Sequence, residues 1–550
     1  MTASRRRWIW KPKCAATSIP PPASARSRRR CARRRNFSRV RRCCGKRWVT
    51  RLSSTTTTRR SGRSPNRTAW SPISNWPAFS SAPDTGNIMT KPIQLISPVD
   101  GRVYAERMPL SLDEAKAVAA RAKAAQPAWA ARPLAERIAL VKAGVAKLNE
   151  MKDRIVEELA WQMGRPTRFG GEFGGVNDRT AYMSEIAESA LAPTVAEASD
   201  RFERRILREP VGVVFIIAPW NYPYLTTINT LVPALIAGNA VVLKHASQTL
   251  LVGERLAEAF HAAGVPEDVF QNVVLDHATT EALIGARAFG FVNFTGSVGG
   301  GAAIERAAAG TFTPLGLELG GKDPGYVRAD ADLDAAVDSL MDGAMFNAGQ
   351  CCCGIERIYV HDSLYDAFVE KAVAWVKTLK LGNPFEPETT LGPMANVRFA
   401  RVVREQVAEA IAAGATPLID PAQFPADDGG AYLAPQILIN VTHDMRVMKE
   451  ESFGPVVGIM KVSGDEEAIG LMNDSPYGLT CSIWTRDAEA AAEIGARIET
   501  GTVFMNRCDY LDPALCWTGC KDTGRGAALS SLGYMSVTRP KSYHLKKVTK

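Results

Sequence analysis

The chain has 550 residues, of which 46% are hydrophobic, and its formal net charge is +10. This length and apolar content predict a globular protein with a full-sized core and at least two domains. No apolar run approaches the ~18 to 20 residues of a membrane-spanning helix, and no hydrophobic signal segment opens the chain, so we expect no membrane partner.

The positive charge is concentrated at the start of the chain. Residues 1–88 contain 22 Lys or Arg and one acidic residue, whereas residues 89–550 contain 45 basic and 56 acidic residues. The arginine runs and the lack of apolar periodicity predict a disordered basic extension. Three interpretations are open: a transit-peptide-like arm, a nucleic-acid-binding arm, or sequence that no native protein carries. We favour the last, because Met89 opens directly onto ordinary globular sequence.

The positions of the cysteines indicate the redox environment of the protein. Four of the eleven fall in the basic extension and three are adjacent, at positions 351–353. Adjacent cysteines fit neither a disulfide framework nor the paired spacing of a zinc site. The pattern therefore predicts a cytoplasmic protein without a metal.

The body of the chain is predicted to begin with helices. Ser111 and Glu114 have the spacing of a capping box, and the helix that they open should stop or bend near Pro127. After Pro133, apolar residues recur with three-four spacing up to residue 159. This predicts one amphipathic helix about seven turns long.

From residue 211 the pattern changes to buried-strand runs that alternate with helical stretches. The runs are Val211 to Ala218, Ala240 to Leu243, Gln271 to Leu275 and Phe289 to Phe294. Continuous apolar runs separated by helices predict a doubly wound parallel sheet. Ligands of such sheets bind beyond the carboxyl ends of the strands. We therefore expect the binding crevice at Pro219 to Asn221, Lys244 and Thr295 to Ser297.

A second α/β segment is predicted from residue 320 to about residue 526. It combines a helix around 332–345, a strand at 357–360 and a helix through 371–379. Two further pieces, 195–209 and 542–550, have the pattern of strands that need an outside partner. Such strands predict assembly into dimers or tetramers.

Two residues in the body suit the two halves of an aldehyde oxidation. A thiolate at Cys352 can add to a carbonyl carbon, and a carboxylate at Glu318 can activate the water that later frees the acid. Either residue alone also has a plain interpretation: Cys352 as a buried thiol, and Glu318 as a surface carboxylate or as a partner of Lys322.

Six motifs occur in a characteristic order along the body. They are Ile217-Ala-Pro-Trp-Asn-Tyr-Pro223, Lys244-His-Ala-Ser247, Phe294-Thr-Gly-Ser-Val-Gly-Gly-Gly301, Glu318-Leu-Gly-Gly-Lys322, Gly349-Gln-Cys-Cys352 and Glu450-Glu-Ser-Phe-Gly-Pro455. Together they resemble the aldehyde dehydrogenase superfamily over roughly residues 93 to 545.

The resemblance implies a fold with three parts. These are a Rossmann-like dinucleotide-binding domain (residues 89–192 and 210–319), a second α/β catalytic domain (320–526) and a small β oligomerisation element (193–209 and 527–550). It also implies a homodimer or homotetramer.

The resemblance further assigns catalytic roles. Cys352 becomes the nucleophile, which forms a thiohemiacetal and then a thioester, and Glu318 becomes the general base for hydrolysis. The amide of Asn221, helped by the backbone amide of Cys352, donates to the oxyanion. The alternative for Asn221 is a cap of the helix that starts near Thr226.

The same resemblance implies an NAD or NADP site. Ser297, with Gly296 and the following helix N-terminus, approaches a phosphate. Lys244 reaches the adenosine ribose, Glu451 reaches the nicotinamide ribose, and Phe453 packs nearby. Trp220 and Ser247 complete the predicted cofactor contacts. Because Ser247 stands where many members have a glutamate, repulsion of a 2′-phosphate is absent and the choice between NAD and NADP stays open.

The predicted substrate funnel is mostly uncharged. It is lined by Tyr222, Tyr224, Asn229, Leu511 and Trp517, with Arg507 and Asp509 near its mouth. Without a clear carboxylate-binding arginine, this lining favours an aromatic or medium-chain aldehyde over a semialdehyde acid.

The sequence therefore predicts an NAD(P)-dependent enzyme that oxidises an aldehyde to the carboxylic acid. One alternative is a dehydrogenase that passes the thioester to coenzyme A, against which Glu318 argues. An alternative of another class is a nucleic-acid-binding protein that acts through the basic extension. We expect no nucleic-acid binding by the body.

Overall fold

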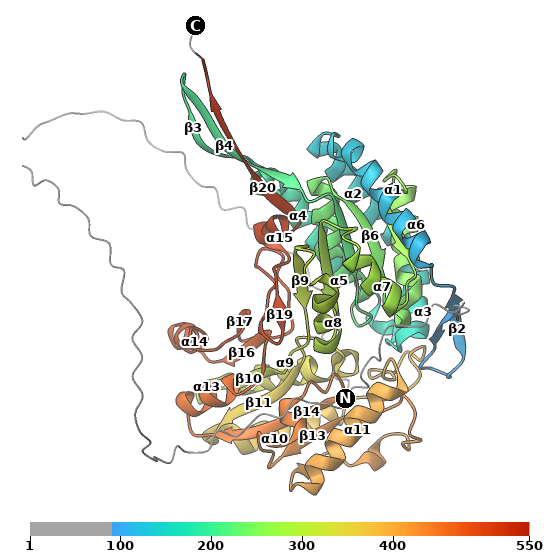
Figure 1. The fold of residues 1–550 in the computed structure, drawn as a ribbon. Coiled ribbons are helices and arrows are strands. Elements are labelled where there is room, and N and C mark those ends of the chain that lie inside the picture. Colours follow the sequence, from blue (N-terminus) through green and yellow to red (C-terminus); the bar gives the residue numbers. More distant parts are fainter. Residues whose placement is uncertain (1–90, 549–550) are drawn as a thin grey trace, which may run out of the picture. The chain divides into compact units, whose positions relative to one another are not determined.

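The computed structural model describes residues 91–548. In this part of the chain two mostly parallel sheets are packed against helices, and an antiparallel three-stranded sheet extends from the first (Figure 1). The predicted α/β class is confirmed. The basic extension predicted for residues 1–88 lies outside the described residues. None of the helices in residues 91–548 has both the length and the apolar character needed to cross a bilayer.

The described part begins with a hairpin and a capped helix. Strands β1 (Ile93–Ile96) and β2 (Val103–Arg107) pair antiparallel. Helix α1 (Leu112–Ala130) starts at the predicted capping box, with Ser111 and Glu114 bonded reciprocally. The helix ends at Ala130, three residues after Pro127 and thus near the expected position. Because Pro127 lies in the last turn, its missing N–H removes a single backbone bond, and Ala131 still donates to Pro127 O at 3.0 Å.

The predicted seven-turn helix is two helices, so this prediction is wrong. Helix α2 (Leu134–Glu150) and helix α3 (Lys152–Met163) are separated at Met151, whose φ of −92° and ψ of 10° interrupt the helix. The Met151 amide donates to Leu148 O, three residues back instead of four. The apolar spacing persists across the break, because both helices bury Val145, Leu148, Ile155 and Leu159 in one core.

The first large sheet has the order β19-β9-β8-β5-β6-β7. Its strands are β5 (Val213–Ile217), β6 (Ala240–Lys244), β7 (Phe270–Val273), β8 (Phe291–Thr295), β9 (Leu315–Glu318) and β19 (Gly524–Arg525). All pairs are parallel except β9 with β19. Its associated helices are α4 (Phe173–Leu191), α5 (Pro223–Ala237), α6 (Leu250–Ala262), α7 (His277–Gly285) and α8 (Val298–Ala308), and short 3₁₀ turns lie at Thr167–Phe169 and Ser247–Thr249.

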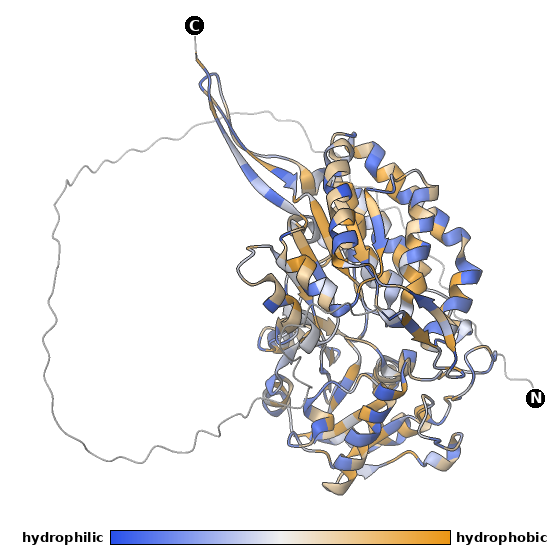
Figure 2. Cartoon of the chain, turned by 45° about the vertical axis from the view of Figure 1, so that its right-hand side comes forward, coloured by the Kyte–Doolittle hydropathy of each residue, from blue (hydrophilic) through white to orange (hydrophobic). Residues whose placement is uncertain are grey.

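This sheet positions a crevice. The chain runs from β5 to β6 and β7 on one side, then crosses to β8 and β9 on the other, so the strand order reverses between β5 and β8. Ligands bind at such a switch point. Every residue of β5 and β6 is buried, and Figure 2 shows the strands of this sheet as mostly hydrophobic while hydrophilic residues line the outer helices.

The second large sheet has the order β12-β13-β14-β11-β10-β16-β17 and is parallel except for β12. Its strands are β10 (Asp323–Val327), β11 (Ile355–His361), β12 (Thr416–Pro417), β13 (Gln436–Ile439), β14 (Val456–Val462), β16 (Thr480–Trp484) and β17 (Thr502–Met505). Its helices are α9 (Leu333–Met345), α10 (Asp362–Val376), α11 (Val397–Ala412), α12 (Arg446–Lys449), α13 (Asp465–Asn473) and α14 (Ala488–Gly495), with 3₁₀ turns at Phe346–Gly349 and Pro421–Gln423. A short pair, β15 (Tyr477–Gly478) with β18 (Cys520–Lys521), lies apart from both large sheets.

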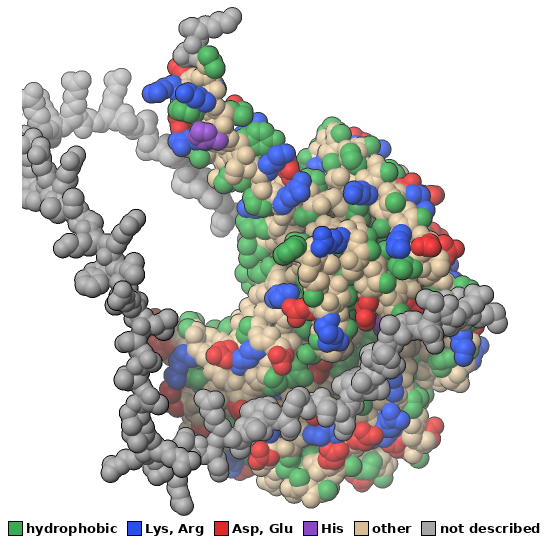
Figure 3. Space-filling view, in the orientation of Figure 1, with side chains coloured by type: hydrophobic (Ala, Val, Ile, Leu, Met, Phe, Trp, Pro, Cys, Tyr) green, Lys and Arg blue, Asp and Glu red, His purple; other side chains and the backbone are tan. Residues whose placement is uncertain are grey.

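The third sheet joins two distant pieces of the chain. Strands β3 (Thr194–Ala198) and β20 (Thr538–Lys546) both pair antiparallel with β4 (Phe202–Pro210). The prediction that these pieces lack a partner within the chain is therefore wrong, because they pair with each other. In Figure 1 the strands extend beyond helix α15 (Ser530–Ser536), which packs against α4 and α5. Figure 3 shows basic side chains along this extension.

Candidate active site

The loop that leads to Cys352 has an uncommon backbone. Asn347, Ala348 and Gly349 have φ values of 55°, 56° and 69° in succession. A Cβ at Gly349 would lie 2.2 Å from Gly454 O, so glycine is required there. The side chain of Gln350 ties the loop down, because Nε2 donates to Asn347 O at 2.9 Å and Oε1 accepts from Ala395 N at 2.8 Å. The nucleophile candidate therefore follows a rigid turn.

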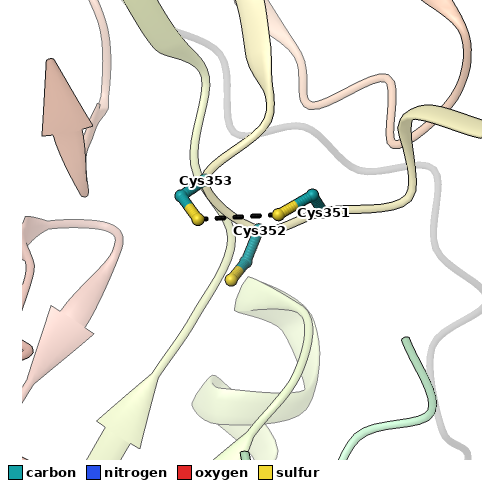
Figure 4. A group of neighbouring side chains, drawn as sticks. All are labelled: Cys351, Cys352 and Cys353. Atoms are coloured by element: carbon teal, nitrogen blue, oxygen red, sulfur yellow. Dashed lines mark hydrogen bonds between the residues drawn. The ribbon is translucent and has the colours of Figure 1, made fainter. Parts of the chain in front are cut away.

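The three adjacent thiols differ in their surroundings. Cys351 and Cys353 are buried, with their Sγ atoms 3.5 Å apart, and both donate to Asp509 Oδ1, at 3.2 and 3.0 Å. Cys352 is partly exposed, and Figure 4 shows its sulfur turned away from the other two. Its interaction with the neighbouring thiols of Cys351 and Cys353, whose own pKa values are raised, holds the pKa of Cys352 well below its usual value. Cys352 is thus the thiol most readily ionised.

Asp509, which the sequence predicts near the mouth of the funnel, accepts hydrogen bonds from the two buried thiols. Its backbone has a φ of 50°, and burial raises the pKa of its carboxyl to about 6. Arg507, predicted beside it, is exposed and its guanidinium lies 3.8 Å from the ring centroid of Tyr510.

Glu318 ends β9 opposite Thr295, which ends β8. Thr295 Oγ1 donates to Glu318 Oε2 at 2.9 Å. Burial raises the pKa of Glu318 to about 7, although the bond from Thr295 and the charge of Arg179 oppose the shift. Lys322 pairs instead with the buried carboxylate of Glu356, so the alternative that Glu318 is the partner of Lys322 is wrong.

Two glycines bring the Glu318 segment against the cysteine loop. A Cβ at Gly321 would lie 2.6 Å from Cys352 O, and one at Gly320 would lie 2.2 Å from Glu451 Oε2. The Gly321 amide also donates to Glu451 Oε1 at 3.2 Å. The carboxylates of Glu318 and Glu451 and the sulfur of Cys352 therefore come from three segments that meet at this glycine pair.

Asn221 follows β5 and is 4% exposed. Its Nδ2 donates to Gln350 O at 3.3 Å, which places the amide beside the loop that carries Cys352. The alternative role as a helix cap is not observed, since α5 begins at Pro223 with Tyr222 at the capping position and no side-chain cap bond.

The carboxyl ends of β6 and β8 carry the predicted phosphate and ribose contacts. Lys244 is 8% exposed, and its Nζ makes no hydrogen bond with the described residues; burial lowers its pKa to about 8. Ser297 is exposed and caps α8 by accepting from Gly300 N at 3.2 Å. Gly296 precedes it, and Ser247 is exposed at the first 3₁₀ turn position after β6. A buried lysine without a hydrogen-bond partner among the described residues and a helix N-terminus, at the carboxyl ends of two strands of one sheet, fit a phosphate-bearing cofactor.

Aromatic residues from both large sheets meet near Trp220. Its ring stacks on Phe399 with centroids 5.2 Å apart and contacts Phe453 edge-on at 5.4 Å. Phe453 has a φ of 50°, and its amide donates to Glu356 Oε1 at 2.9 Å. Burial, followed by the nearby charge of Glu356, raises the pKa of Glu451 well above its usual value.

The predicted funnel residues separate into two groups. Tyr222, Leu511 and Trp517 share one hydrophobic cluster with the cysteine triplet. Tyr224 instead belongs to the core beside the first sheet, so its placement in the funnel is wrong. Asn229 is buried and accepts a hydrogen bond from Arg179.

Two features near the site were missed by the sequence analysis. The buried pair of Arg165 and Glu172, 2.7 Å apart, connects to the backbone at Asn221 and Leu225. Arg179 of α4 is 4% exposed, and its charge acts on Glu318 and Cys352. Both arginines lie on segments without a recognised motif, so no local signal marked them.

Comparison with known proteins agrees with this arrangement. The sequence profile of the aldehyde dehydrogenase family matches residues 86–543. A succinate-semialdehyde dehydrogenase [NADP(+)] of Deinococcus radiodurans is 33% identical over 82% of this chain and 94% of its own length. A betaine aldehyde dehydrogenase of Bacillus subtilis is 34% identical over 74% and 84%. The crystal structure of an NAD-dependent aldehyde dehydrogenase from Sinorhizobium meliloti superposes with a TM-score of 0.79 at 32% identity, covering 83% of this chain and 91% of that one.

The chain belongs to the aldehyde dehydrogenase family. It is an NAD(P)-dependent oxidoreductase that converts an aldehyde to the carboxylic acid.

Proposed function

We propose that Cys352 is the nucleophile that carries the aldehyde through oxidation. The observation that supports this most directly is the asymmetry of the triplet: Cys351 and Cys353 are buried against Asp509, while Cys352 is turned away with a depressed pKa. A thiolate at that position forms a C–S bond to the aldehyde carbon, and the carbonyl π electrons become an oxyanion.

Asn221 stabilises that oxyanion in the proposal. Its amide donates to Gln350 O, two residues before Cys352, which holds the donor beside the loop that carries the nucleophile. The backbone amide of Cys352 is the second donor. A fixed donor of this kind acts without reorganisation during the reaction.

Glu318 completes the cycle as general base. When bound, the nicotinamide ring supplies the acceptor for the hydride that the thiohemiacetal loses as it becomes a thioester. Glu318 then takes a proton from water, the resulting hydroxide adds to the thioester carbon, and the C–S bond breaks to release the acid and restore the Cys352 thiolate. A base with a pKa of about 7 is matched to this task near neutral pH.

The proposed cofactor contacts follow from the crevice. Lys244 and Ser247 hold the adenosine ribose, Ser297 and Gly296 approach a phosphate, and Glu451 holds the nicotinamide ribose with Phe453 and Trp220 packed beside it. The absence of a carboxylate at Ser247 supports acceptance of a 2′-phosphate, so we propose that either NAD or NADP binds.

The finer organisation is also a proposal. We divide residues 89–550 into a dinucleotide-binding domain (89–192 and 210–319), a catalytic domain (320–526) and oligomerisation segments (193–209 and 527–550). The outer strands β3 and β20 leave backbone groups free for another copy, which supports a homodimer or homotetramer. The seven free cysteines among residues 91–548 support a cytoplasmic location.

Substitution of the nucleophile tests the proposal. Cys352→Ala should abolish formation of the reduced cofactor across a panel of aldehydes. Cys520→Ser removes a thiol that donates to Glu499 O and is not part of the hydrophobic cluster of the triplet, so it should keep the parent rate. Parent-level turnover by Cys352→Ala would refute the assignment.

A further inference from the structure

Arg179 has an incomplete set of polar partners. Its Nη1 donates to Leu225 O at 2.9 Å and to Asn229 Oδ1 at 2.8 Å. Its Nε and Nη2 make no hydrogen bond with residues 91–548, and neither nitrogen is sealed from solvent. Nε and Nη2 form the edge of a guanidinium that binds both oxygens of a carboxylate. The guanidinium edge that suits an anion therefore has no hydrogen-bond partner among the described residues.

The other buried arginines of the described chain are better satisfied. Arg165 pairs with Glu172 at 2.7 Å. Arg137 directs Nε and Nη1 to backbone carbonyls, and Arg357 directs Nε, Nη1 and Nη2 to them. Arg179 has no ion pair, and Glu172, the carboxylate whose charge acts on it most, is already held by Arg165. A buried cation of this kind is costly unless a ligand supplies the anion.

Arg179 lies within electrostatic reach of the proposed reaction site. The charge of Arg179 acts on Cys353, Glu318 and Cys352. Because Arg179 occupies Asn229 Oδ1, it fixes the orientation of that amide, whose Nδ2 is buried without a partner. The hydroxyl of Tyr222, in the hydrophobic cluster of the triplet, is also buried without a partner. The guanidinium edge, Asn229 Nδ2 and the Tyr222 hydroxyl therefore all lack acceptors among the described residues.

We propose that Arg179, assisted by Asn229 Nδ2, binds a carboxylate at the far end of the substrate, so that the preferred aldehydes carry an anionic tail. This inference rests on the proposed function of Cys352, whose site it extends. It differs from the sequence-based expectation of an uncharged aldehyde. That expectation was made because no carboxylate-binding arginine was recognised in the predicted funnel. The same cation disfavours aldehydes with a cationic tail.

Matched pairs of aldehydes test the charge preference without changing substrate shape. 4-Oxobutanoate is compared with 4-methylpentanal, 4-formylbenzoate with 4-isopropylbenzaldehyde, and betaine aldehyde with 3,3-dimethylbutanal. The parent should have a higher kcat/KM for each anion than for its neutral partner, and a lower one for the cation. Because the neutral aldehydes also report Cys352 chemistry, failure of the proposed function would appear as no Cys352-dependent turnover of any substrate.

The variant Arg179→Met keeps the length of the side chain and removes the charge. Assayed at pH 9, where Glu318 is ionised even without the opposing charge of Arg179, it should lower kcat/KM for both anions by about 10- to 100-fold, mainly through KM, while the neutral aldehydes change by less than about threefold. Arg179→Lys should recover part of the loss. Equal losses for anionic and neutral aldehydes would mean a structural role and overturn the inference. If Arg179→Met does not fold, the kcat/KM values of the parent protein for the matched pairs decide alone. A higher kcat/KM for the neutral aldehyde in both anionic pairs would then overturn the inference.

Discussion

Thr295 donates a hydrogen bond of 2.9 Å to Oε2 of Glu318, and the two residues face each other at the carboxyl ends of neighbouring strands β8 and β9. The hydroxyl stabilises the charged form of a carboxylate that burial would otherwise protonate. The pKa of Glu318 therefore settles at about 7. The register of two parallel strands thus sets the strength of the proposed base.

The pH dependence of turnover follows from this value. Glu318 accepts a proton only as the carboxylate, so turnover should fall as the pH decreases through about 7 and level off above it. Steady-state rates from pH 5.5 to 9 measure this acidic limb. The Glu318→Gln protein should give a single burst of reduced cofactor and then stall. Unchanged steady turnover by Glu318→Gln would exclude Glu318 as the base.

Removing the hydroxyl at residue 295 should move the acidic limb. Thr295→Val deletes the bond that lowers the pKa of Glu318, so the limb should shift to higher pH. Turnover at pH 7 should drop several-fold while the rate at pH 9 stays close to that of the parent. Thr295→Ser retains a donor and serves as the control. A limb that stays in place in Thr295→Val would show that the hydroxyl does not tune this carboxylate.

Loss of the proposed oxyanion donor should slow the chemical step. Asn221→Ala removes an amide worth ~3 kcal/mol of barrier in comparable sites, which corresponds to a loss of about a hundredfold in kcat. The burst rate in stopped-flow absorbance reports this step separately from hydrolysis. Because Asn221 also donates to Gln350 O, thermal unfolding of the variant must be measured alongside. A burst within threefold of the parent would remove Asn221 from the mechanism.

The close approach of Gly321 to Cys352 predicts an effect on both stability and activity. A Cβ at Gly321 would meet Cys352 O at 2.6 Å, so Gly321→Ala must displace the cysteine loop and should cost about 1 to 3 kcal/mol of unfolding free energy. Turnover should fall as well. Gly470→Ala, within α13 and with open space around the new methyl, is the matched control and should be neutral or stabilising. Urea unfolding of both variants measures the difference.

Sequence patterns predicted the parallel strands well, because their signal is local. The run at 240–243 became the fully buried strand β6, and the capping box at Ser111 opened α1. The break at Met151 lacked any glycine or proline to mark it. The pairing of β4 with β20 joins segments far apart along the chain, and no pattern in either strand identifies the other.

In the candidate site, too, residues that stand in short motifs were predicted, whereas contacts between residues far apart in sequence were not. Cys352 and Glu318 each stand in a short motif, and the structure places their segments in contact through Gly321. Asp509 reaches the triplet from a loop more than 150 residues away in sequence, and Arg179 lies on a helix without a motif. The partners of buried charges depend on tertiary packing, so neither contact was predictable.

The central claim is that the oxidised substrate is held on the sulfur of Cys352. Glu318→Gln protein incubated with aldehyde and NAD(P)⁺ should accumulate this thioester, because hydrolysis is blocked. Acid quenching, digestion and tandem mass spectrometry should then find one acyl group per chain, assigned by fragmentation to Cys352 and formed in step with the reduced cofactor. An acyl group on Cys351 or Cys353, or a burst of reduced cofactor with no acylated cysteine, would contradict the account.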